Sequence, residues 1–221
     1  DEGASSILPY EGADNPFMFV YGELDFFLNE PFEEDNGWNN LDEDDATGGI
    51  WERGIPNGTV YQGEQVQPDE DYSIDGDYCY ITGNEVGSSV GFDDIDGGVT
   101  SIISPTYNLS NYSSVLLTYF RWFTNNLGDN PSSDIFSVSI SGDGGITWVD
   151  LERTNLSNND WERKRFILDS YIDLTSEVVF KIQAEDVFHE GDFGSGGSLV
   201  EAALDDFRID IISYDGTLGD I

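Results

Sequence analysis

Cysteine and histidine are scarce in this sequence, and each shortage excludes a class of functional site. Cys79 is the only cysteine among the 221 residues, so the chain can form neither an intrachain disulfide nor a thiolate metal site. His189 is the only histidine, which excludes a two-histidine zinc site. Two carboxylates can serve a glycoside hydrolase, but the 45 acidic residues form so many possible pairs that the sequence identifies none of them as catalytic. We therefore expect a protein that is not an enzyme.

Basic residues are scarce as well. Six arginines and two lysines stand against 45 acidic residues, and the formal net charge is −37 at pH 7. A field of this sign repels nucleic acid and anionic membrane surfaces, because both are bound by clustered lysine and arginine. Three explanations of the acidity remain: a halophilic or marine surface kept soluble by carboxylates, binding of hard cations, or attraction to cationic partners. We favour the first two.

Long apolar runs are absent too. No stretch approaches 18 apolar residues, and the start, DEGASSILPYEGADNP, lacks the charged and apolar regions of a signal peptide. Neither a membrane span nor a signal peptide is expected, which fits a mature fragment of an exported protein and a cytosolic protein equally. Hydrophobic residues still make up 38% of the chain and aromatic residues 14%, which is enough for a packed core. We expect a single large domain.

Short runs of β-branched and aromatic residues recur between clusters of Gly, Asn, Asp and Ser, and helical periodicity is almost absent. In one run, Phe136, Val138 and Ile140 alternate with serines, as expected when one face packs on a second sheet and the other meets solvent. The pattern predicts an all-β fold, an antiparallel β-sandwich. The predicted strands are 16–22, 26–33, 77–82, 114–124, 134–141, 146–152, 164–169, 177–185 and 199–212.

Three stretches depart from this alternation. LLTYFRWFT, within 114–124, does not alternate, which indicates a central strand covered on both faces or a strand with exposed aromatic side chains. The acidic and glycine-rich stretches 34–76 and 186–198 are predicted to be loops. Loops of this length are unusual in a compact domain and are candidates for ion sites or lids.

The eight residues SGDGGITW, from Ser141 to Trp148, fit the Asp-box spelling Ser-x-Asp-x-Gly-x-Thr-Trp of sialidase propellers. A propeller needs several blades that each carry the repeated signature, whereas this chain holds one copy. A sialidase also needs an arginine cluster for its anionic substrate, and the arginines here are scattered. Asp accepts nearby backbone N–H groups and Gly tolerates positive φ, so the motif predicts a tight hairpin turn.

Seven segments occur in an order that resembles a known family: NEPFE, GGIWERGIPNGT, QPDEDYSIDGDYCYITGN, DDIDGGVTSIISPTYNLS, FRWFTNN, DIFSVSISGDGGITW and VEAALDDFRI. Together they resemble the jelly-roll accessory domains that follow catalytic domains in secreted bacterial peptidases, notably zinc carboxypeptidase-like proteins, and more distantly MAM domains. The resemblance implies a jelly-roll β-sandwich over 26–212, preceded by an N-terminal extension or extra strand at 1–25. The tail at 213–221, SYDGTLGDI, resembles a linker into the start of a dockerin-type calcium repeat, which implies a missing downstream module.

Clustered carboxylates predict a calcium site, because Ca²⁺ takes six to eight oxygen ligands. In GFDDIDGG, Asp93, Asp94 and Asp96 precede glycines that let carbonyl groups turn inward. Asp205 shares a strand phase with Phe207 in LDDFRIDII, and a carboxylate on an apolar face needs a cation or hydrogen-bond partners. We expect the partner of Asp205 to be a metal ion.

The family resemblance implies a structural calcium ion between the first and last strands, with Glu33 and Asp205 as ligands and the DDIDGG loop contributing. Asp77 is a weaker candidate of the same kind. The full set of predicted metal ligands is Glu33, Asp94, Asp96, Asp205, Asp206 and Asp71.

Aromatic side chains predict a second kind of site. Trp51, Trp122 and Trp161 are candidate platforms for sugar rings, with Arg121 beside them, although a tryptophan is more often part of the core. The resemblance implies a non-catalytic, calcium-stabilised accessory domain of a secreted or cell-surface bacterial protein, which positions or stabilises an attached enzyme. Two alternatives stay open: a carbohydrate-binding module, or a structural subunit of an adhesin or surface filament. The expected partners are an extracellular polysaccharide, a protein surface or the attached catalytic domain.

Overall fold

The structure is a computed structural model that describes residues 22–87, 89–187 and 197–213. Within these residues the chain forms thirteen strands and one three-residue 3₁₀-helix, η1 (Leu168–Ser170). The all-β prediction is confirmed. No helix of the described ranges is long and apolar enough to span a membrane. The strand predicted at 16–22 lies almost wholly outside the described residues.

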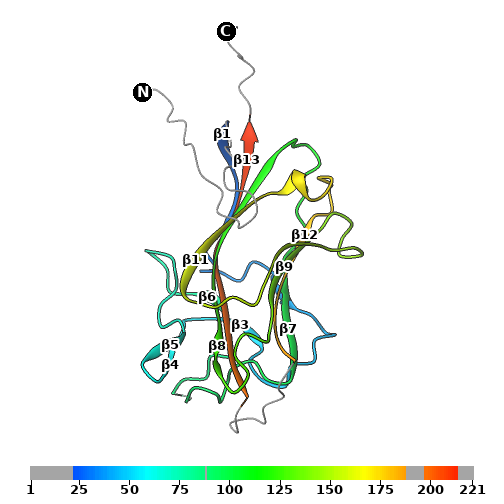
Figure 1. Cartoon of the computed structure of the whole chain (residues 1–221). Helices are drawn as coiled ribbons and strands as arrows, with labels where there is room; N and C mark the ends of the chain where they lie inside the picture. The colour runs from blue at the N-terminus through cyan, green and yellow to red at the C-terminus, as the bar shows by residue number, and fades with distance from the viewer. Residues whose placement is uncertain (1–21, 88, 188–196, 214–221) are drawn as a thin grey trace, which may run out of the picture.

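Two antiparallel sheets face each other and form the two layers of the molecule (Figure 1). The first sheet has the order β11 (Asn158–Ile167), β8 (Val115–Gly128), β13 (Ser198–Ser213), β6 (Cys79–Thr82) and β3 (Trp51–Gly54), and β1 (Glu23–Glu30) also pairs with β13. The second sheet has the order β10 (Val149–Thr154), β9 (Phe136–Ser141), β12 (Val179–Asp186), β7 (Gly98–Ile103) and β2 (Asn39–Asn40). A separate hairpin pairs β4 (Thr59–Tyr61) with β5 (Glu64–Gln67).

The core lies between the two sheets and follows the predicted alternation. Phe136, Val138 and Ile140 of β9 and Phe180 and Ile182 of β12 are all buried in it. The serines that alternate with them on β9 were expected to face solvent, but they are buried as well. Polar neighbours cover them: the hydroxyl of Ser139, for example, donates to Asp150 of β10.

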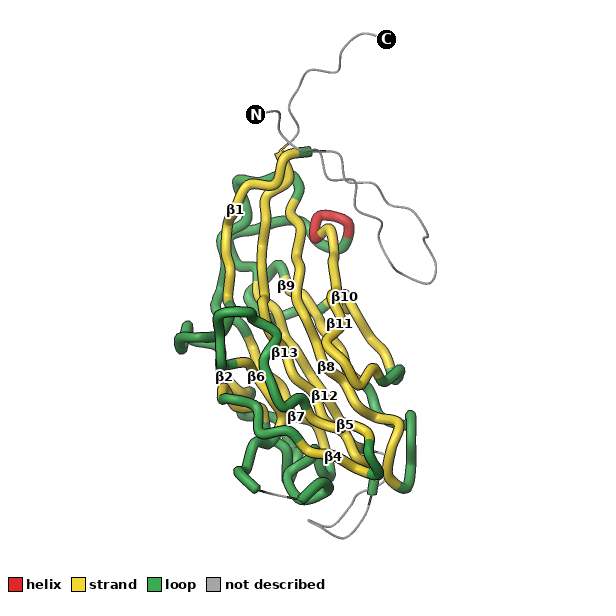
Figure 2. Tube along the Cα trace, turned by 90° about the vertical axis from the view of Figure 1, so that its left-hand side faces the viewer, coloured by secondary structure: helices red, strands yellow, loops and turns green. Residues whose placement is uncertain are grey.

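Strand β8 is covered on both faces, which confirms one of the two interpretations of its unbroken apolar run. Leu117 and Tyr119 point into the sandwich core. Trp122 lies on the opposite face, where it packs with Ile81 in a second, smaller cluster. Strand β5 covers this outer face and contacts β8, β13 and β11 (Figure 2).

The stretch 34–76, predicted to be a loop, contains four short strands, β2 to β5. Each has only two to four residues, too few for an alternating pattern to show. β3 is specified by its partner β6, because Trp51 pairs with Thr82. The loop 41–46 bonds to β7 of the second sheet, and the loop after β5 supplies the residues described next.

Candidate functional site

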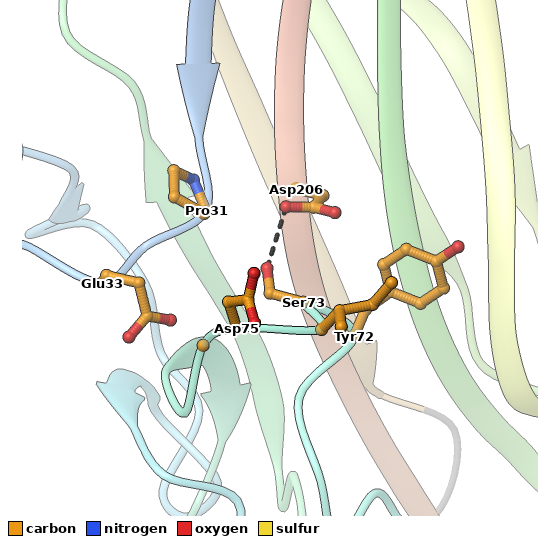
Figure 3. Close-up of a pocket in the computed structure, with 8 residues that line it drawn as sticks. Pro31, Glu33, Tyr72, Ser73, Asp75 and Asp206 are labelled. Carbon is orange, nitrogen blue, oxygen red and sulfur yellow. Dashed lines mark hydrogen bonds between the residues drawn. The ribbon is translucent and has the colours of Figure 1, made fainter.

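A hollow of about 490 Å³ opens where the loop 69–78 crosses the outer face of the first sheet, beside β13 and the end of β1 (Figure 3). We call it the acidic hollow. Its lining residues are Pro31, Glu33, Tyr72, Ser73, Ile74, Asp75, Gly76 and Asp206.

A β-bulge in β13 brings Asp205 and Asp206 to this face. The register of β13 against β8 shifts between Asp205 and Arg208, and Asp206 has a φ of 46°. Leu204 and Phe207 both face the core, so the bulge reverses the strand phase between them. The prediction that Asp205 lies on the same apolar face as Phe207 was therefore wrong.

Backbone amides satisfy the buried carboxylate of Asp205. Its Oδ2 accepts hydrogen bonds from the N–H groups of Tyr72 (2.8 Å) and Ser73 (3.2 Å), and its Oδ1 accepts one from Asp206 N–H (2.7 Å). Asp205 is fully buried, and these three donors offset the cost of its burial. Sequence left two kinds of partner open for Asp205, and the structure provides hydrogen-bond donors, two of them from the loop that covers it.

Glu33 fixes the other end of the same loop. Its Oε1 accepts hydrogen bonds from the N–H groups of Asp77 and Tyr78, both at 3.1 Å. The Ser73 hydroxyl, between the two anchors, donates to Asp206 Oδ1 at 2.9 Å (Figure 3). Carboxylates from the end of β1 and from β13 therefore hold one loop in place.

Negative charge accumulates around Asp71. Its Oδ2 is buried without a hydrogen-bond donor. Burial, together with the charges of Glu33, Asp77 and Asp206, raises the pKa of Asp71 to about 6. The pKa of Asp205 is raised to about 7, mainly by burial, against the lowering effect of its amide donors. A bound cation would relieve this repulsion.

Asp94 and Asp96 form a separate acidic cluster, although sequence placed them in the same site as Glu33. They are buried in the loop before β7. Burial and then the charge of Asp96 raise the pKa of Asp94 to about 7, whereas the charges acting on Asp205 are those of Asp206 and Asp71. Among the described residues, no group of three or more His, Cys, Asp or Glu side chains is placed to hold a metal ion.

Three of the four predicted ligand-binding side chains are buried and offer no surface to a sugar. Trp51 is 2% exposed and donates its Nε1–H to Thr100 O (3.1 Å), and Trp122 is 6% exposed and donates to Val66 O (2.7 Å). Arg121 is 2% exposed and points into the core. These side chains are buried parts of the β-sandwich, which agrees with the interpretation of tryptophan as a core residue.

Trp161 is the exception, because it is partly exposed beside the acidic hollow. Its ring meets the edge of Tyr72, with 6.3 Å between ring centroids, and its Nε1–H donates to Glu70 O at 3.2 Å. Tyr72 is 38% exposed and stacks on Phe120 at 3.5 Å. Sequence reasoning missed Tyr72 and Phe120; the only signal was the unbroken apolar run of β8.

Two sequence motifs have no catalytic role: the Asp box forms a turn, and a Gly-x-Ser-x-Gly match lies in a loop. The Asp box forms the predicted hairpin turn between β9 and β10, where Asp143 Oδ1 accepts the N–H groups of Ile146 and Thr147, and hydrogen bonds from Ser141 and Thr147 lower the Asp143 pKa to about 2. Residues 87–91 have the Gly-x-Ser-x-Gly spacing, but Ser89 lies in the loop between β6 and β7, whereas a nucleophile elbow needs a strand-to-helix turn. His189 lies outside the described residues.

No protein-family model matches this sequence, and no curated protein matches it. Among solved structures, the K1 cleaved adhesin domain of Lys-gingipain from Porphyromonas gingivalis W83 is similar, with a TM-score of 0.51, 16% identity and coverage of 84% of this chain and 98% of that domain. The K3 domain of the same protein has a TM-score of 0.46 at 15% identity, covering 83% and 98%. TmCBM61, solved with β-1,4-galactotriose, has a TM-score of 0.45 at 11% identity, covering 83% and 97%. The likeness to the K1 domain and the two antiparallel sheets establish the predicted jelly-roll type of β-sandwich.

Proposed function

We propose that this chain is a non-catalytic binding domain of a secreted or cell-surface bacterial protein, and that calcium at the acidic hollow stabilises it. One observation carries the proposal: carboxylates from three distant segments converge on a single solvent-open hollow beside partly exposed aromatic rings. A concave site with a few polar groups and aromatic walls suits a ligand rather than a buried structural role. The expected partner is an extracellular polysaccharide or protein surface.

Calcium fits the chemistry of the hollow. Glu33 Oε1 and Asp71 Oδ2 both lie next to Gly76, which lines the hollow, and these two carboxylates would hold the ion. The buried Asp71 Oδ2 has no hydrogen-bond donor, and hard oxygen ligands are those that Ca²⁺ prefers. The ion would supply positive charge where three carboxylates repel one another. Asp205 would act by holding the loop, since backbone amides already occupy its oxygens.

The non-catalytic part of the proposal is supported by what the carboxylates already do. Glu33 and Asp205 accept backbone N–H groups and fix the loop 69–78, so they lack the freedom of a general acid and base. Incubation of the isolated chain with glycan and peptide panels tests this directly. Turnover of any substrate would overturn a purely binding role.

Carbohydrate is the first partner to test, because Tyr72 and Trp161 flank the hollow. We expect retention on one or more insoluble polysaccharides, and loss of it in Tyr72→Ala and Trp161→Ala. Phe26→Ala is the matched control, since Phe26 is 67% exposed on β1 and lies outside the hollow. Absence of glycan binding would leave a protein partner or the attached enzyme, and large species in light scattering would favour the adhesin or filament alternative.

A further inference from the structure

A second group of buried carboxylates lies where the start of β9, the end of β12 and the loop before β7 meet. Asp186 is the last residue of β12 and pairs with Gly98 of β7, and Asp134 lies two residues before β9. Both side chains have 0% exposure. Neither residue belongs to the acidic hollow.

The oxygens of this group lack hydrogen-bond donors. Asp186 has no partner for Oδ1 or Oδ2, and Asp134 has none for Oδ2, although its Oδ1 accepts Val187 N–H at 3.0 Å. Asn125 of β8 is also fully buried; its Nδ2 donates to Asp134 O at 2.6 Å, while its Oδ1 has no donor. Buried polar atoms are nearly always paired, so four such oxygens within neighbouring residues require an explanation.

Two carboxylates that face each other without a donor need a positive charge between them. Burial, followed by the charges of Asp134, Asp96 and Asp94, raises the pKa of Asp186 to about 8. The pair can therefore share one proton, or it can bind a cation. A cation would also account for the Asn125 amide oxygen, whereas a proton shared between the carboxyl groups leaves that oxygen without a partner.

We propose that Asp134, Asp186 and Asn125 Oδ1 bind a calcium ion that joins the two sheets. The charge balances, since two carboxylates neutralise one Ca²⁺, and the remaining ligands are neutral oxygens. Calcium accepts flexible coordination by protein oxygens, whereas Mg²⁺ keeps several waters, for which this buried group is less suited. Because Asn125 belongs to the first sheet and Asp186 to the second, the ion would clamp one to the other. Asp94 and Asp96 add negative charge around it.

Melting temperatures of the full chain test the proposal, measured at neutral pH in chelator and in calcium. In chelator we expect Asp186→Asn to melt at or above the wild type, because the amide removes a buried charge. In calcium we expect the wild type to melt above the variant. At a calcium concentration about a hundred times the Kd of the site, the melting temperature of the wild type should rise by about 5 °C, and Asp186→Asn should lack this rise. Titration calorimetry should count one calcium ion fewer in Asp186→Asn and in Asp134→Asn.

Asp71→Asn separates this site from the acidic hollow, because it removes a ligand of the hollow alone. It should keep the calcium response of the Asp134 and Asp186 pair, even if the proposed function fails. An equal calcium shift in wild type and Asp186→Asn would overturn the site, and so would a variant that melts higher in both buffers, the sign of a shared proton. If Asp186→Asn does not fold, the same measurements on Asp134→Asn and the ion count of the wild type decide. A wild-type protein that binds no calcium ion would overturn the proposal.

Discussion

Glu201 shows how single residues in this acidic chain tolerate burial. It is 2% exposed, and its Oε2 accepts the Thr82 hydroxyl at 3.2 Å and Gln67 Nε2 at 3.3 Å. Burial raises the Glu201 pKa well above its usual range, and the charge of Asp94 adds to the effect. The raised pKa favours the neutral acid, and a neutral acid can lie in the core without a basic partner at a lower cost than a carboxylate.

This shift makes stability depend on pH. The folded state holds the Glu201 proton more tightly than the unfolded state, so the stabilising contribution is complete below about pH 4 and is lost as pH rises through the raised pKa. Glu201→Gln keeps the shape and both hydrogen bonds but cannot ionise. In urea unfolding at pH 5 and pH 8, we expect the variant to lose less stability than the wild type between the two values. Glu177→Gln, at an exposed position, should behave as the wild type.

Trp122 and Trp161 should respond differently to truncation. Trp122→Ala removes a buried indole and its hydrogen bond to Val66 O, and we expect it to cost about 3–5 kcal/mol of unfolding free energy. Trp161→Ala should cost clearly less, because the side chain is partly exposed. Equal costs in denaturant titrations would contradict the assignment of Trp122 to the core and Trp161 to the surface.

Sequence could not separate these two tryptophans. The partner that covers Trp122 is Val66 of β5, 56 residues earlier in the chain, and only the tertiary fold brings it there. The carboxylates were easier to predict, since Glu33, Asp71, Asp77, Asp205 and Asp206 do gather at one place. Sequence did not reveal the hydrogen-bond donors to Asp205 and Glu33, because those donors include backbone amides of a loop.

At the scale of elements, the long strands were predictable and their irregularities were not. The prediction 199–212 agrees closely with β13 (Ser198–Ser213), since a long apolar run specifies a buried strand. The bulge at Asp206 depends instead on Ser73 and Tyr72, which bind the two aspartates from another loop. Asp134 and Asp186 were also missed, because each lies at a strand end with no local motif around it.

An ion cluster joins the two sheets at the edge formed by β8, β10 and β11. Arg121 Nη2 lies 2.8 Å from Glu152 Oε1 and 2.9 Å from Glu162 Oε2, and Lys164 Nζ contacts the same two carboxylates at 3.2 and 2.8 Å. Glu152 comes from the second sheet and the other three from the first. Tyr119 completes the cluster by donating its hydroxyl to Glu152 Oε2 at 2.7 Å.

Breaking this cluster on one side should destabilise the sandwich more than removing both sides. Arg121→Met leaves the Glu152 carboxylate buried without its main partner, and we expect a cost of about 3–5 kcal/mol. The double variant Arg121→Met with Glu152→Gln should recover part of that loss, because no unpaired charge remains. Additive costs in this double-mutant cycle would show that the two side chains are not coupled.

At the scale of the whole molecule, the repulsion that accompanies a net charge of −37 opposes the stabilisation that the packed core provides. The pattern of short aromatic and β-branched runs predicted the β-class despite the charge. The likeness in fold to an adhesin domain at 16% identity shows that very different sequences adopt this architecture. Charge therefore governs the conditions under which the fold is stable, and packing governs which fold forms.

Ion-specific stabilisation distinguishes bound calcium from general screening. Added NaCl shortens the Debye length from about 10 Å at about 0.1 M to about 3 Å at about 1 M, so it should raise the melting temperature of the chelated protein by weakening repulsion at the surface. Calcium at millimolar concentration should raise it further than MgCl₂ of the same ionic strength, because the hollow and the Asp134 and Asp186 pair offer oxygens rather than space for hydrated magnesium. If thermal melts in the two divalent salts coincide at matched ionic strength, the acidity acts only as a diffuse field, and neither calcium site exists.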